Sequence, residues 1–307
     1  MQEQPKAKIF FFVPVARFLA LNFVSSFERA RAEADHLGIA AFTVAEWNGF
    51  SVDIANKRNV GVSRFLQSDM EWLMMVDDDM DFRHDPAAIA KMLAVAIDQK
   101  ADIVAPLMVR RDPPHYVCYN ETRGVPDDTL KGYMAHKNDQ VIECTGHVGT
   151  GCILIRRKVV EALEPPWFQT VPRFDCRVCQ SKQGDPAKSD CERCHGKGKD
   201  PEGCWFEQGE DTFFCRNAHD AGFKVVCAAG IKVGHLGESS LTIEDSVRVT
   251  YPVIHAQGIL HSIQRQMADM EERNVKIPDG MRKALEGLSP LSKIQGNGEK
   301  KLVVATR

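Results

Sequence analysis

Short apolar runs alternate with amphipathic segments in the first third of the chain, and this alternation restricts the possible folds more than any other feature. Runs typical of buried strands lie at residues 8–14, 39–46, 70–76 and 102–108. Segments with helical spacing of apolar residues lie at 19–37, 52–67 and 86–100. Strands that alternate with helices form βαβ units, whose strands run parallel and whose helices cover the sheet. The sequence therefore predicts an α/β fold with a mostly parallel central sheet.

The pattern changes after this region. Shorter strands and loops are expected first. A helix at 209–222, two short strands at 223–235 and a helical region at 240–273 are expected later, before a polar tail. A segment rich in Cys, Lys, Asp and Gly lies between the shorter strands and the helix at 209–222. We therefore expect a main domain at 1–240, an insertion within it at 173–204 and a helical C-terminal extension at 241–307.

The size, charge and apolar segments of the chain are those of an ordinary globular protein without a membrane span or secretory signal. The chain has 307 residues, 44% of them hydrophobic, so it can bury a core without disulfide staples. Its formal net charge is -3, which gives no overall attraction to nucleic acid. No apolar stretch is long enough for a membrane span. The apolar N-terminus is interrupted by Pro14 and Arg17, unlike a secretory signal, so a cytoplasmic location is expected.

Three consecutive acids, Asp77, Asp78 and Asp79, directly follow the predicted strand at 70–76. Ligands bind at the carboxyl ends of strands in open α/β sheets, and adjacent carboxylates repel one another unless a cation is present. A hard divalent cation takes oxygen ligands and can bridge a carboxylate and phosphate groups. The acids thus predict a metal-and-nucleotide site, with a solvated acidic turn as the alternative. The glycine-rich phosphate loop of dinucleotide-binding folds is missing, because residues 13–18 read VPVARF.

Two C-x-x-C pairs lie in the predicted insertion, Cys176 with Cys179 and Cys191 with Cys194, with eleven residues (180–190) between the pairs. This spacing is typical of a tetrahedral structural Zn²⁺ site. A segment of this composition cannot build a core of its own, so the metal would hold it together. Residues 173–204 carry seven Lys or Arg against six Asp or Glu, and this balance of +1 does not indicate nucleic-acid binding.

Three segments carry a resemblance to a known family. Arg58 and Asn59 precede the D-x-D spacing of Asp77 and Asp79, a Gly-rich segment follows at 146–163, and an E-D-x-x-F helix start leads to His235 at the end of 209–235. In this order, over most of residues 8–240, they resemble the GT-A fold glycosyltransferases of the family 2-like type, including some bacteriophage-encoded ones. The resemblance implies a GT-A-like nucleotide-diphospho-sugar transferase sandwich with a small zinc-knuckle insertion and a helical C-terminal extension. For a bacteriophage enzyme it implies the host cytoplasm.

The resemblance also implies a role for each matching residue. The nucleoside-diphosphate-sugar donor would be bound by Arg58, Asn59, Asp77 and Asp78. Mn²⁺ or Mg²⁺ would be held by Asp79 and His235. Asp211 would be the general base towards a hydroxyl acceptor, which is a saccharide, a protein or a modified nucleic acid. The acceptor side would be formed by Gly149, Thr150, Gly151 and Glu210.

Simpler explanations stay open at these positions. Glu210 and Asp211 stand where acids favour a helix dipole, and the Gly149–Gly151 segment is equally typical of a tight turn. In a retaining enzyme Asp211 would position the acceptor instead. Arg110 and Arg111 follow a predicted strand and could contact a phosphate or sugar, although surface arginine pairs are usually solvated. Two other functions remain: a nucleotidyltransferase, and a non-catalytic zinc-knuckle binding protein on a degenerate transferase fold.

Overall fold

The computed structural model describes most of the first 245 residues. The described residues are 7–15, 19–36, 38, 40–47, 53–111, 117, 119–120, 129–173, 176, 178–179, 191–201, 203, 205–237, 240–245 and 267. The elements of the first half are β1 (Lys8–Val15), α1 (Leu21–His36), β2 (Ala40–Trp47), α2 (Ile54–Leu66), β3 (Trp72–Val76), β4 (Met80–Asp81), η1 (Phe82–His84), α3 (Ala88–Asp98) and β5 (Ile103–Pro106).

The second half contains shorter strands. Its elements are β6 (Tyr119–Asn120), α4 (Thr129–Lys137), β7 (Val141–Glu143), β8 (His147–Val148), β9 (Cys152–Arg156), α5 (Arg157–Ala162), β10 (Val171–Arg173), β11 (Trp205–Gln208), α6 (Glu210–Asp220), β12 (Val225–Ala228), β13 (Gly234–Leu236) and β14 (Ser240–Leu241).

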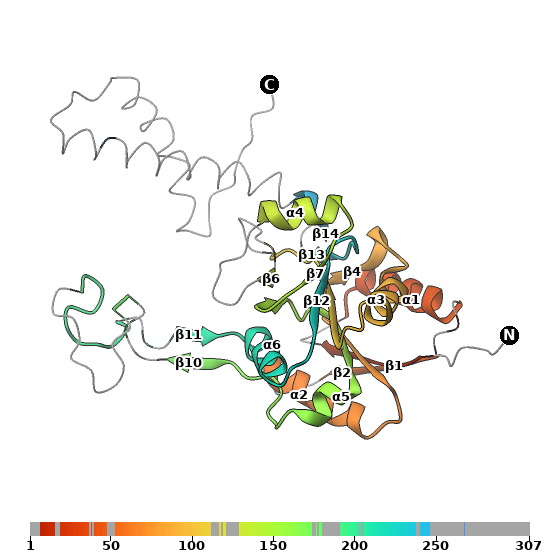
Figure 1. Cartoon of the computed structure of the whole chain (residues 1–307), viewed down its shortest axis with the longest axis horizontal. Coiled ribbons are helices and arrows are strands. Elements are labelled where there is room, and N and C mark those ends of the chain that lie inside the picture. Colours follow the sequence, from red (N-terminus) through yellow and green to blue (C-terminus); the bar gives the residue numbers. More distant parts are fainter. Residues whose placement is uncertain are drawn as a thin grey trace.

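A seven-stranded sheet forms the centre of the molecule, in the order β2-β1-β3-β9-β5-β12-β7 (Figure 1). β1 pairs in parallel with β2 and β3, and β5 pairs in parallel with β12. β9 is antiparallel to both β3 and β5, and β7 is antiparallel to β12. The predicted α/β fold with a mostly parallel sheet is therefore confirmed.

The antiparallel strand β9 in the middle of the sheet is the main feature that the alternation of strands and helices did not predict. β9 begins with Cys152 beside Val76, the last residue of β3. The chain therefore enters β9 from the edge where the parallel strands end, and it must run the opposite way. This entry brings Gly149–Gly151 next to the acids that follow β3.

Apolar side chains fill both faces of the sheet, as expected for strands covered on both sides. On β1, Ile9 and Phe11 pack against helices α1 and α3, whereas Phe10 and Phe12 pack towards α2, α5 and α6. The helices lie on the two sides of the sheet in the same way (Figure 1). Gly61 lets α2 approach β1 closely, because a Cβ there would lie 2.5 Å from a ring carbon of Phe12. Helix α2 carries Arg58 one turn earlier.

The predicted insertion begins and ends in a two-stranded hairpin, in which β10 and β11 pair antiparallel. The hairpin extends away from the body and carries the cysteine-rich segment at its far end (Figure 1). β11 leads through Gly209 directly into α6. The insertion is thus joined to the helix that begins with Glu210 and Asp211.

The C-terminal prediction is tested only at its start. Ser240 and Leu241 form strand β14, which pairs with β13, and residues 243–245 are helical, so the helix expected beyond 240 begins just after this strand. Most of the predicted helical region at 240–273, and nearly all of the extension at 241–307, lies outside the described residues. Among the helices that are described, none has the length and apolar character needed to cross a membrane.

Candidate active site and cysteine cluster

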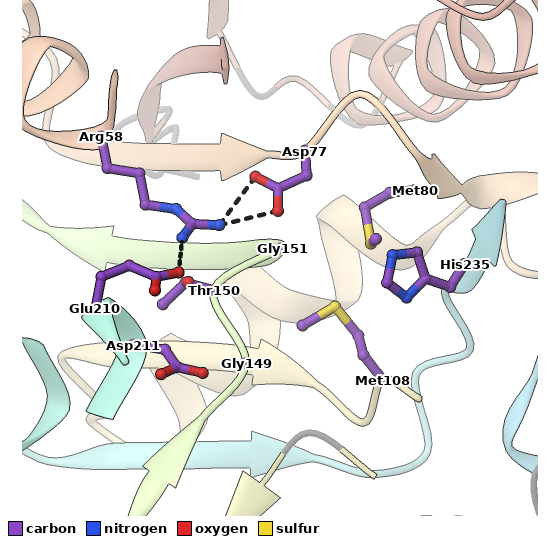
Figure 2. A pocket seen from close by; sticks show the side chains of 10 residues that line it. All are labelled: Arg58, Asp77, Met80, Met108, Gly149, Thr150, Gly151, Glu210, Asp211 and His235. Atoms are coloured by element: carbon purple, nitrogen blue, oxygen red, sulfur yellow. Dashed lines mark hydrogen bonds and ion pairs between the residues drawn. The ribbon is translucent and has the colours of Figure 1, made fainter. Parts of the chain in front are cut away.

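A cavity of about 160 Å³ lies where β3 ends, β9 begins and α6 starts (Figure 2). The lining residues that the sequence singled out are Arg58, Asp77, Gly149, Thr150, Gly151, Glu210, Asp211 and His235. Met80 and Met108 complete the lining and were not predicted, since a single methionine gives no signal of function. Residues far apart in the sequence therefore meet at one cavity.

Asp77 lies close to the first residues of β9. Its backbone N–H donates to the carbonyl oxygen of Gly151 at 2.7 Å. A Cβ at Gly151 would lie 3.3 Å from Oδ2 of Asp77 and equally close to the end of the Met80 side chain. An added methyl group here would press on the acid and on the end of the Met80 side chain.

Arg58 is the most buried charged group of the site, with 2% of its surface exposed. Its Nη2 donates to Oδ1 and Oδ2 of Asp77 at 3.0 and 2.9 Å, and its Nη1 donates to Oε1 of Glu210 (Figure 2). The guanidinium therefore clamps the end of β3 to the start of α6. In this structure it is engaged by two carboxylates, and the direct donor contact implied by the family resemblance stays a prediction.

Asn59 uses its amide to hold a backbone segment. Its Nδ2 donates to the carbonyl oxygen of Phe168 at 2.8 Å, and its Oδ1 accepts from the Phe168 N–H at 3.0 Å. The Phe168 ring stacks on Phe214 of α6 at 4.5 Å between centroids. Asn59 thus supports the same helix that Arg58 clamps, and its predicted donor contact is not among these bonds.

Carboxylates outnumber cations around the cavity. Asp77, Glu210 and Asp211 line it together with a single arginine, Arg58. Burial raises the pKa of Asp77, and the carboxylates of Asp79 and Glu210 raise it further, against the opposing effect of Arg58. Crowded carboxylates of this kind favour an additional cation. Asp78 lies in the turn between Asp77 and Asp79, partly exposed.

Asp79, rather than Asp77, faces His235. Nδ1 of His235 lies 2.8 Å from the carbonyl oxygen of Val109, so Nδ1 must donate, because a carbonyl only accepts. Nε2 is then directed at Oδ2 of Asp79, 3.3 Å away. Burial lowers the pKa of His235, but the Asp79 carboxylate and the Val109 carbonyl raise it by more. A neutral imidazole would place a lone pair against a carboxylate oxygen, so this pair requires a proton or a metal ion.

These residues fit a divalent cation. Oδ1 of Asp79 is buried and has no hydrogen-bond partner within the described part of the chain, so an oxygen ligand remains available. The bond from His235 Nδ1 to a backbone carbonyl is the usual way in which a metal-ligating histidine is oriented. An oxygen and an imidazole nitrogen together suit Mn²⁺, and the oxygen ligands suit Mg²⁺.

Asp211 contacts its own helix start and also lines the cavity. Its Oδ1 accepts from the Thr212 N–H at 2.6 Å and from the Thr212 hydroxyl at 3.3 Å. A Cβ at Gly209 would lie 2.8 Å from the same oxygen, so glycine makes room for the carboxylate. The helix-start role and a role in the cavity are therefore compatible.

His147 is a residue near the site that the sequence reasoning did not single out. It lies on β8, which packs against α6, and burial lowers its pKa while the charge of Asp211 opposes this effect. Its position within the Gly-rich segment at 146–163 was the available signal.

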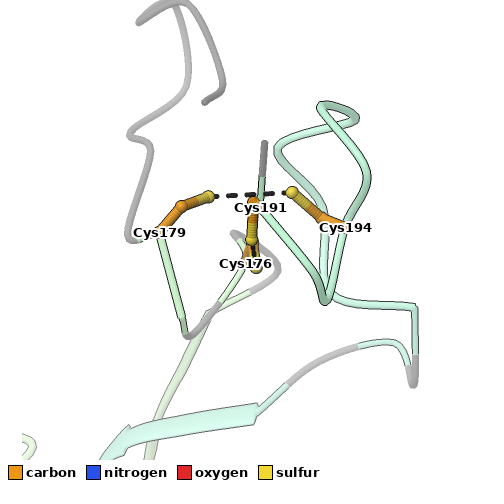
Figure 3. A group of neighbouring side chains, drawn as sticks. All are labelled: Cys176, Cys179, Cys191 and Cys194. Carbon is orange, nitrogen blue, oxygen red and sulfur yellow. Dashed lines mark hydrogen bonds between the residues drawn. The ribbon is translucent and has the colours of Figure 1, made fainter. Parts of the chain in front are cut away.

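The four cysteines of the insertion meet at one point, as the spacing predicted (Figure 3). Their Sγ atoms all lie within 4.8 Å of one another, and the pairs Cys176–Cys191 and Cys179–Cys194 are each 3.7 Å apart. A tetrahedron of sulfur atoms around Zn²⁺ has edges of about 3.8 Å, given a Zn–S bond of about 2.3 Å. The separations match this geometry and are far longer than a disulfide bond.

The turn after the second C-x-x-C pair is tight. His195, Gly196 and Gly198 have φ values of 48, 76 and 68°, in the left-handed region where glycine is favoured. The N–H of Cys176 donates to the carbonyl of Gly198 at 2.9 Å, which ties the two halves of the cluster together. The glycines that follow Cys194 in the sequence are therefore required by the turn itself.

Comparisons with known proteins give similarities of structure only. No protein-family model matches the chain, and no curated protein matches its sequence. Similar solved structures include A197 from STIV, with a TM-score of 0.46 and 15% identity over 78% of this chain and 91% of that one. A glycosyltransferase involved in the glycosylation of the major capsid of PBCV-1 has a TM-score of 0.27 and 13% identity over 52% and 69%. A Drosophila beta-1,4-galactosyltransferase 7 variant, in complex with manganese, UDP-Gal and xylobiose, has a TM-score of 0.35 and 15% identity over 75% and 71%, so the similar structures include glycosyltransferases.

Proposed function

We propose that this chain is a metal-dependent glycosyltransferase that moves a sugar from a nucleoside-diphosphate-sugar donor to a hydroxyl acceptor. The observation that carries the proposal is the meeting of three features at one cavity: Asp77 after β3, His235 on β13, and Asp211 at the start of α6. Asp79 does not line the cavity, but its Oδ2 lies 3.3 Å from Nε2 of His235, which does. A donor site, a metal site and a base are what such a transfer requires.

Asp79 and His235 would hold Mn²⁺ or Mg²⁺, and Asp77 and Asp78 would lie beside the donor. When bound, the cation neutralises the charge that develops on the diphosphate leaving group. Arg58 contributes by keeping Asp77 and Glu210 in place, and Asn59 contributes through Phe168. In this assignment both Arg58 and Asn59 support the donor side as positioning residues.

Asp211 would take the proton from the acceptor hydroxyl as that oxygen attacks the anomeric carbon of the sugar. A hydroxyl has a high pKa, so removal of its proton in the transition state eases the attack. Gly149, Thr150, Gly151 and Glu210 would form the acceptor side around it. In a retaining reaction Asp211 would instead orient the acceptor. The acceptor itself is a saccharide, a protein or a modified nucleic acid.

The cysteine cluster would hold a structural Zn²⁺ in the insertion at 173–204, within a transferase domain at 1–240 that is followed by the extension at 241–307. The zinc would keep the far end of the β10–β11 hairpin folded, because the described cysteine segment packs only a small cluster of cysteines. This assignment gives the cluster a structural role.

Donor binding tests the proposed metal site. Nucleotide-sugars should raise the melting temperature of the wild-type protein in the presence of Mn²⁺, since a ligand that binds only the folded state stabilises it. Asp79→Ala should abolish Mn²⁺-dependent donor binding, and His235→Ala should weaken it by ~10-fold or more. Calorimetric titration measures both, with Asp85→Ala as a matched control, because Asp85 pairs with Lys91 away from the cavity. Unchanged affinity in Asp79→Ala would place the metal elsewhere.

Metal analysis tests the cysteine cluster. Protein purified without added metal should contain one zinc ion per chain, because four thiolates complete a tetrahedral site. Cys191→Ser should release the zinc and make the insertion sensitive to protease. Cys227→Ser serves as the control, since Cys227 is buried in the sheet and its zinc content should equal that of the wild type. Zinc-free wild-type protein would contradict the assignment.

A further inference from the structure

Arg111 occupies the place where the ligands of the proposed cation meet. Its Nη1 lies 3.1 Å from Oδ2 of Asp79, the same oxygen that lies 3.3 Å from Nε2 of His235. Arg111 lies two residues after Val109, whose carbonyl orients the His235 ring. The guanidinium is thus part of the Asp79–His235 cluster, although it does not line the cavity.

This contact is easily broken. The Arg111 side chain is 54% exposed, whereas that of Asp79 is 23% exposed. Exposed ion pairs contribute little to stability, so the side chain can leave Asp79 at small cost. His235 Nε2 is directed at Oδ2 of Asp79, so a cation held by both residues would lie at that oxygen and would repel the guanidinium from it, whether or not Oδ1 also binds the cation. Binding of the cation therefore requires that Arg111 leave Asp79.

The diphosphate of the donor offers Arg111 a new partner. Once released, Arg111 remains beside the cation, because its backbone follows the segment that is bonded to His235. The anionic group that binds next to that cation is the diphosphate, and the planar guanidinium fork suits phosphate oxygens. Arg58 is not available for this role, since Asp77 and Glu210 occupy it.

We propose that Arg111 has two positions: it stands in for the cation at Asp79 in the ligand-free protein, and it binds a diphosphate oxygen of the donor once the cation is present. This inference rests on the proposed function. It assigns Arg111 opposite effects on two binding steps: competition with the metal ion, and stabilisation of the metal-bound nucleotide.

The test is a pair of calorimetric titrations on Arg111→Met. Mn²⁺ alone should bind the variant about 2- to 5-fold more tightly than the wild type, because a competing exposed ion pair has been removed. UDP, GDP and ADP are titrated in turn at saturating Mn²⁺ to find the nucleoside diphosphate that the wild type binds. That nucleotide should bind Arg111→Met about 10- to 100-fold more weakly, because a charge-assisted hydrogen bond has been lost. Arg110→Met removes the same charge from the adjacent position and should show neither change.

Tighter Mn²⁺ binding together with weaker nucleoside-diphosphate binding by Arg111→Met would support the inference. Weaker Mn²⁺ binding by Arg111→Met, or unchanged affinity in both titrations, would overturn it. If the wild type binds Mn²⁺ and a nucleoside diphosphate but Arg111→Met behaves identically, the proposed function stands and this inference alone fails. If the wild type binds no Mn²⁺, the proposed metal site fails, and the role of Arg111 at that site fails with it.

Discussion

Asp211→Asn should lower sugar transfer to the acceptor by roughly 10²–10⁴-fold while leaving donor and Mn²⁺ affinity near the wild-type values. Asparagine keeps the size of the side chain, and its Oδ1 can still accept from the Thr212 N–H, so the helix start should be preserved. It loses the capacity to take a proton. Steady-state transfer assays and donor titrations on the same variant separate the two effects.

A second variant separates loss of the carboxylate from disturbance of the helix start. Thr212→Val is the matched control, because it removes the hydroxyl that donates to Asp211 and leaves the carboxylate in the cavity. Should Asp211→Asn transfer sugar at the wild-type rate, Asp211 is only a helix-start acid, and the base lies elsewhere or the reaction is retaining.

Arg58→Met should destabilise the folded protein by about 3–5 kcal/mol, the usual cost of removing one partner from a buried ion pair. Asp77 and Glu210 would then face each other without the cation that links them. Urea unfolding measures the loss as a change in the free energy of unfolding.

Arg31→Met provides the comparison for Arg58→Met. Arg31 also pairs with two carboxylates, those of Glu28 and Asp35, but its side chain is 29% exposed on the surface of α1. Exposed pairs of this kind contribute about 0–1 kcal/mol. If the two variants lose similar amounts of stability, burial does not increase the contribution of Arg58 to the free energy of unfolding.

The sequence alone predicted the features that depend on neighbours along the chain. β1, β3 and β5 are buried on both faces, so each reads as an apolar run, and each lies within a residue or two of the predicted limits. The four cysteines were predicted to meet because a C-x-x-C pair brings two thiols together within one turn, and two such pairs complete one site. In both cases the signal lies within a few adjacent residues.

Only the tertiary structure decided which charged groups meet. Arg58 and Glu210 are 152 positions apart, and their pairing depends on how α2 and α6 pack beside the end of β3. The turn at Asp77–Asp79 directs Asp79 to His235, and Asp77 to Arg58, although both acids look alike in the sequence. The amide of Asn59 and the guanidinium of Arg111 likewise found partners that no local pattern indicates. A charged or polar side chain interacts with whichever group the packed elements bring within about 3–4 Å, and that choice is made by contacts distant in sequence.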